Sequence, residues 1–121
     1  MIRGIKFASV PVRDQAAALK FYTEKLGFKV VTDQPFNEKQ RWIELGIPGS
    51  KDEVVLFTME GHENRIGEFQ QVTFWSDDVF ATAKVLKSRG VEFTKEPKTE
   101  PWGSSAIFKD QDGNQFVISS K

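Results

Sequence analysis

The sequence predicts an α+β fold built from two pseudo-symmetric βαβββ modules. The first observation is an internal repeat: the segments that begin at Phe7 and Gln71 each read as an alternating strand, an acidic residue and the start of a helix. The second is that both predicted helices end alike, at Leu26-Gly27-Phe28 and Arg89-Gly90-Val91. A duplicated unit folds the same way twice and leaves a cleft between the copies. We therefore expect the functional site in that cleft.

The length predicts one domain that spans residues 1–121. A module of half that length is marginally stable alone, because a short chain buries too small a fraction of its surface. We therefore expect the two modules to share a core. The first module is predicted at about residues 1–59, a polar linker at about 60–67 and the second module at about 68–121.

The first module begins with a predicted strand over residues 3–12, which ends in Val-Pro-Val, as suits a strand end because proline donates no ladder hydrogen bond. Asp14 is the predicted N-cap of the helix, and Gly27 lies where a left-handed C-terminal cap is expected. One helical face carries Gln15, Leu19, Tyr22 and Leu26. Three strands follow, predicted over residues 28–32, 41–45 and 54–58, and the last two form a hairpin around the Gly and Pro residues of 46–50.

The second module repeats this order. Residues 71–75 are a predicted strand, and Asp77 or Asp78 caps a helix that ends at Gly90. The predicted buried helix positions are Val79, Ala83 and Leu86. A short strand is predicted over 91–93, followed by a hairpin of 104–108 and 115–119 that Asp112-Gly113 turns.

Composition excludes several classes of function. The chain has no cysteine, so it has no disulfide and no thiolate nucleophile or metal ligand. Its 17 basic and 17 acidic side chains give no net field toward nucleic acid or an anionic membrane, so neither partner is expected. The first six residues interleave charged and apolar side chains, unlike a secretory signal, and no apolar run reaches membrane-spanning length. A cytoplasmic location is expected.

Two motifs resemble the vicinal oxygen chelate superfamily, which includes glyoxalases, bleomycin resistance proteins and dioxygenases. The first motif consists of Val12, Asp14, Phe21, Tyr22, Leu26, Gly27 and Phe28, and the second of Phe108, Asp110, Asp112, Gly113 and Asn114. The resemblance implies that the curved sheets of the two modules form a partly closed cage. It also implies a homodimer.

In the metal-using members of that superfamily, the ligands come from the first and last strand of each module. The resemblance places these positions at Phe7, Leu56, Gln71 and Val117. A divalent ion needs imidazole, thiolate or carboxylate donors, and only Gln71 offers so much as a neutral amide oxygen. Neighbouring strand positions offer no histidine or carboxylate either. We therefore expect no metal and no cofactor.

The lone histidine, His62, lies in the predicted linker between Gly61 and Glu63. An imidazole and two carboxylates could coordinate a surface cation there. A solvated loop histidine is the preferred interpretation, and no Ser-His-Asp set can be built around it.

Strand alternation predicts which side chains line the cage. Ile43 and Leu45 are expected to face the helix, which directs Trp42 and Glu44 into the cage. The predicted ligand-binding residues are Phe7, Ser9, Trp42, Glu44, Leu56, Gln71, Thr73, Trp75, Trp102 and Val117. A largely apolar lining with a few polar groups is typical of a small-molecule site. Burial among apolar side chains would raise the pKa of Glu44, which makes it the candidate catalytic acid or base.

These residues leave three functional hypotheses open. The first is a metal-free protein that binds a small, planar, apolar molecule such as an antibiotic. The second is a glyoxalase-like lyase or a dioxygenase that uses a different metal site or Glu44. The third is a cage whose lining, including Phe7, Leu56 and Val117, is an ordinary core that supports a dimer.

Overall fold

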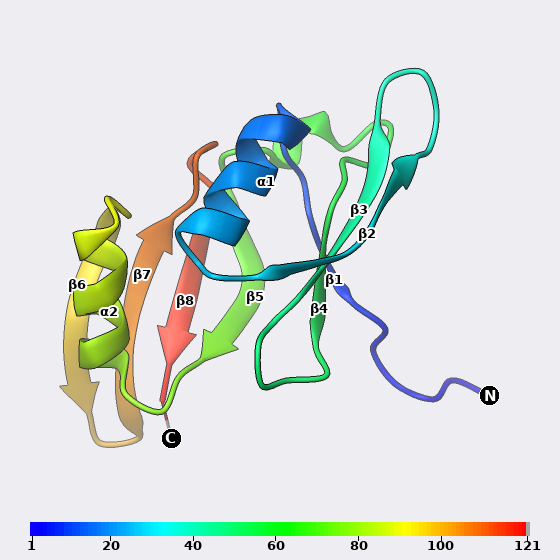
Figure 1. The fold of residues 1–121 in the computed structure, drawn as a ribbon. Helices are drawn as coiled ribbons and strands as arrows, with labels where there is room; N and C mark the ends of the chain where they lie inside the picture. The colour runs from blue at the N-terminus through cyan, green and yellow to red at the C-terminus, as the bar shows by residue number, and fades with distance from the viewer. Residues whose placement is uncertain (121) are drawn as a thin grey trace. The chain divides into compact units, whose positions relative to one another are not determined.

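The computed structural model describes residues 1–120 and divides the chain into two compact units, Met1–Ile66 (unit 1) and Gly67 onward (unit 2). Each unit holds one long helix and one four-stranded sheet (Figure 1). The strand orders, β1-β4-β3-β2 and β5-β8-β7-β6, are equivalent, and in each sheet the first strand runs parallel to the last. The predicted α+β fold of two βαβββ modules is confirmed.

The elements of unit 1 follow the predicted order. They are β1 (Ala8–Val10), α1 (Gln15–Glu24), β2 (Lys29–Pro35), β3 (Arg41–Gly46), β4 (Glu53–Leu56) and a short 3-10 helix, η1 (Glu63–Arg65). Those of unit 2 are β5 (Phe69–Trp75), α2 (Val79–Ser88), β6 (Phe93–Glu100), β7 (Gly103–Lys109) and β8 (Gln115–Ser119). Within residues 1–120, neither helix has the length and apolar character needed to cross a bilayer.

Both helices begin on an aspartate cap. The Asp14 carboxylate accepts hydrogen bonds from the backbone N–H groups of Ala16 (2.9 Å) and Ala17 (3.2 Å). The Asp78 carboxylate accepts one from the N–H of Ala81 (3.0 Å), so Asp78 rather than Asp77 is the second cap. These bonds satisfy N–H groups that have no partner inside the helix.

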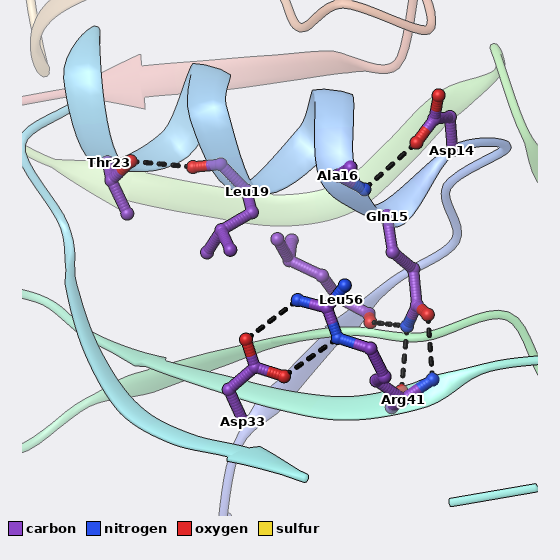
Figure 2. Close-up of polar contacts among 8 residues, drawn as sticks. All are labelled: Asp14, Gln15, Ala16, Leu19, Thr23, Asp33, Arg41 and Leu56. Carbon is purple, nitrogen blue, oxygen red and sulfur yellow. Dashed lines mark hydrogen bonds and ion pairs between the residues drawn. The ribbon is translucent and has the colours of Figure 1, made fainter. Parts of the chain in front are cut away.

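In unit 1, Gln15 joins the first turn of α1 to two strands (Figure 2). Its side-chain N–H donates to the backbone carbonyls of Arg41 (2.7 Å) and Leu56 (2.8 Å), and its oxygen accepts from the N–H of Arg41 (2.8 Å). One amide thus satisfies three backbone groups across β3 and β4. Because buried backbone groups are costly to leave unpaired, this contact fixes the helix against the sheet.

In unit 2, a buried amide has the corresponding role. Asn114 is fully buried, and its side-chain oxygen accepts from the N–H of Gly67 (2.8 Å) and the side chain of Gln70 (3.0 Å). Its side-chain N–H donates to the Asp110 carboxylate (2.8 Å). The second motif of the sequence therefore ties the β7–β8 turn to the start of β5.

Three strands differ most from their predicted extent. β1 is shorter than the predicted residues 3–12, whereas β2 and β6 extend well beyond residues 28–32 and 91–93. Both longer strands lie at a sheet edge, and their side chains are largely exposed. Such strands lack the apolar alternation of a half-buried strand, so only their pairing with β3 and β7 reveals them.

Gly67 and Gly61 form a matched pair for a stability test. Both have left-handed φ angles, +87° and +88°, but an added Cβ would lie 3.2 Å from the Asp112 carbonyl oxygen at Gly67 and meet nothing within 4 Å at Gly61. We expect Gly61→Ala to lower the free energy of unfolding by about 1 kcal/mol through the φ angle alone. Gly67→Ala should cost about 1 kcal/mol more, because the carbonyl must shift.

Urea denaturation of the two variants and the parent protein measures both values. Equal losses would contradict the close packing of the β7–β8 turn against Gly67.

Candidate functional site

Strand pairing determines which side chains of unit 1 share a face of the sheet. Glu44 and Ser9 both pair with Val55, so these three side chains lie on one face. Ile43, Leu45 and Leu56 point to the opposite face and are fully buried. We call the face that carries Glu44 the aromatic face.

Four rings form a cluster on the aromatic face. Trp42 lies 5.7 Å from Phe7, 5.1 Å from Phe57 and 5.8 Å from Phe36, measured between ring centroids. Phe36 and Phe57 are 4.9 Å apart in an edge-to-face arrangement. Phe36 is 58% exposed and the other three rings are half-buried, so the cluster presents ring surface to its surroundings.

A carboxyl pair lies beside the rings. The Trp42 indole N–H donates to Glu44 Oε1 at 2.8 Å, and Glu53 hydrogen-bonds the Glu44 side chain. That hydrogen bond raises the pKa of Glu53, and partial desolvation and the negative charge of Glu44 act in the same direction. The positive charge of Lys6 acts to lower the pKa of Glu53, but the pKa is still raised overall.

Unit 2 carries a different set of groups on the face that includes Thr73. Thr73 pairs with Val117 and Trp75 pairs with Ser119, so these four side chains share that face, which we call the polar face. Trp75 is 68% exposed, and Gln71 two residues before Thr73 is also exposed. The opposite face holds the buried Phe108 and Phe116 rings in contact with Phe74.

A comparison with known sequences places the fold in a family. A sequence profile of the Glyoxalase/Bleomycin resistance protein/Dioxygenase superfamily matches residues 4–118. The chain belongs to this superfamily. It is 36% identical to the uncharacterized protein YetH of Bacillus subtilis (strain 168) over 121 residues, which cover 98% of each chain.

Two solved structures extend the comparison. A superfamily member from Sphaerobacter thermophilus DSM 20745 matches with a TM-score of 0.88 at 33% identity, over 99% of this chain and 98% of that one. TnmS3, an antibiotic binding protein from Streptomyces sp. CB03234, matches with a TM-score of 0.85 at 34% identity, over 98% of this chain and 96% of that one.

The predicted placement of Leu56 in the superfamily cage is wrong. Leu56 pairs with Val10 and points toward α1, where it is fully buried (Figure 2). The prediction was shifted by one residue along β4, and a shift of one residue moves a side chain to the other face. The β4-side residues on the aromatic face are Glu53, Val55 and Phe57.

Strand pairing agrees with the other predicted facings, while a ligand role for these residues stays a prediction. Ser9, Trp42 and Glu44 lie on the aromatic face, with Phe7 in ring contact with Trp42. Thr73, Trp75 and Val117 lie on the polar face, and Gln71 is exposed two residues before Thr73. Trp102 is 61% exposed in the β6–β7 turn, and His62 is exposed before η1.

The positions that the resemblance assigns to metal ligands do not fit a metal ion in this chain. Phe7 and Val117 carry no donor atom, Leu56 is buried on the other face of its sheet, and Gln71 supplies one neutral amide. Among residues 1–120, no three His, Cys, Asp or Glu side chains come together as a ligand set.

Sequence reasoning missed Glu53, Phe36 and Phe57 as members of the aromatic face. Alternation from Trp42 and Glu44 through the β3–β4 hairpin could have identified Glu53 and Phe57, had the hairpin register been known. The sequence pattern around Phe36 did not indicate its place on this face, because Phe36 follows the exposed edge strand β2 in a polar stretch. Only its ring contacts with Trp42 and Phe57 reveal it.

The raised pKa of Glu53 predicts a pH-dependent effect of Glu53→Gln. A carboxyl with a raised native pKa stabilises the fold below its unfolded value, near 4.5, and loses that contribution as the pH rises through the native value. Glu53→Gln removes the charge, so its Tm should exceed that of the parent increasingly as the pH rises above 4.5. For a partly exposed pair we expect a gain below about 2 °C.

Thermal unfolding between pH 4 and pH 8 measures the difference. Glu24→Gln, at the exposed end of α1, changes the net charge equally and serves as the control. A Tm difference that does not vary with pH would contradict the carboxyl pair.

Proposed function

We propose that this protein binds a small, planar, aromatic molecule on the aromatic face of unit 1, without a metal. The observation that supports this most directly is the cluster around Trp42, in which Phe36 remains 58% exposed. Large apolar rings that protrude from a sheet face are unusual unless they contact another molecule. Flat ligands stack on such rings, and each aromatic pair contributes about 0.5–1.5 kcal/mol beyond the area it buries.

The polar groups beside the rings suit the same function. Small-molecule sites combine apolar and aromatic surface with a few polar groups that orient the ligand. On this face Glu44 and Ser9 supply such groups, and Trp42 is held in place by its bond to Glu44. The relative TnmS3 is an antibiotic binding protein, which supports a binding role for the fold.

An acid–base activity is the second candidate, and the carboxyl pair favours it. Glu53 holds its proton more tightly than an ordinary glutamate while Glu44 lies beside it. Carboxyl groups whose environments separate their pKa values can divide the roles of acid and base.

We also propose that the protein is a homodimer and that it has no nucleic-acid or membrane partner. Light scattering tests the mass expected of the dimer.

Two exposed phenylalanines allow a matched test of the binding function. Phe36 lies in the ring cluster, and Phe80 on α2 has a similar exposure of 49%. Isothermal titration with 1-naphthalenemethanol should give saturable binding to the parent protein. Phe36→Ala should weaken it about tenfold, the equivalent of about 1.4 kcal/mol, whereas Phe80→Ala should leave it unchanged.

No saturable heat up to the solubility limit of the probe would overturn the proposal. So would an equal loss of affinity in both variants, because the binding would then not depend on the ring cluster.

A further inference from the structure

The carboxyl pair lies on the same face as the ring cluster. Glu44 pairs with Val55 and Gly46 pairs with Glu53, so the two carboxyl side chains project from neighbouring positions of β3 and β4. The Trp42 indole N–H donates a hydrogen bond to Glu44 Oε1 at 2.8 Å. This bond joins the carboxyl pair to the ring cluster. A ligand stacked on Trp42 would therefore have two carboxyl groups within reach of its edge.

Glu44 and Glu53 place two carboxyl groups side by side on the aromatic face. Two ionised carboxylates repel each other, so a cation that bonds both is favoured at this place. The positive groups near this pair are Lys6, whose charge acts on Glu53, and Lys29, which pairs with Gly46 at the start of β2. Within residues 1–120, neither of these two lysines forms an ion pair with Glu44 or Glu53.

We propose that the aromatic face selects ligands that carry a protonated amine on a short link to their aromatic ring, and that this ammonium binds between the Glu44 and Glu53 carboxyl groups. The inference rests on the proposed function and names the class of ligand.

The chemistry of an ammonium group fits this position. It has three N–H donors, enough to bond both carboxylates at once, and hydrogen bonds between ions are about twice as strong as neutral ones. A cation close to an indole face gains a further attraction from the ring. An alcohol of the same shape brings one donor and no charge, and a carboxylate is repelled.

Three naphthalene probes separate charge from shape. They are 1-naphthalenemethylamine, which is cationic at pH 7, the neutral 1-naphthalenemethanol and the anionic 1-naphthoate. Titration calorimetry at pH 7 should show the amine bound about tenfold more tightly than the alcohol, and the naphthoate more weakly than both.

Substitutions assign the effect to the carboxyl pair. Glu53→Gln and Glu44→Gln should each remove most of the amine's advantage over the alcohol. Glu24→Gln, at the exposed end of α1, should leave that advantage unchanged. The comparison of the three probes on the parent protein tests the inference even if a substitution impairs folding.

The outcomes distinguish the two proposals. If all three probes bind equally, the inference about charge is overturned and the binding function stands. If none of the three binds, the proposed function is overturned as well. An amine advantage that survives in Glu53→Gln and Glu44→Gln would also overturn the inference.

Discussion

The pairing of Glu44 with Val55 is the constraint on which the candidate site depends. Side chains alternate across a strand, so this one register sends Trp42, Glu44 and Val55 to the aromatic face and Ile43 and Leu45 to the buried face. A shift of one residue would bury a carboxylate and a tryptophan N–H against apolar side chains. The cost of burying those groups without partners, a few kcal/mol each, makes the observed register the stable one.

Side-chain amides hold that arrangement in each unit. Gln15 bonds three backbone groups of β3 and β4, and Asn114 joins the β7–β8 turn to Gly67 and Gln70. Each amide bonds backbone groups that strand pairing does not satisfy. A protein with this architecture can therefore hold its sheets in place from the helix side and from the turns. The remaining face of each sheet does not need to contribute to that stability.

The parts of the fold that the sequence predicts are those with a local physical signal. Asp14, Asp78 and their helices could be predicted, because capping and helical periodicity are encoded within a few residues. The edge strands β2 and β6 could not, since their exposed side chains carry no alternation and pairing alone defines them. Leu56 was assigned to the wrong face for a related reason: a hairpin's register depends on its turn, and the turn at residues 46–50 does not specify it.

The two units show how one fold can carry two kinds of surface. Their helices and buried faces are equivalent, and this equivalence keeps the repeat recognisable. Their other faces have diverged: unit 1 presents Trp42 with a carboxyl pair, and unit 2 presents Trp75 with Thr73 and Ser119. Substitutions on a face that does not pack against the helix have a small effect on stability, so that face can change its chemistry while the fold is kept.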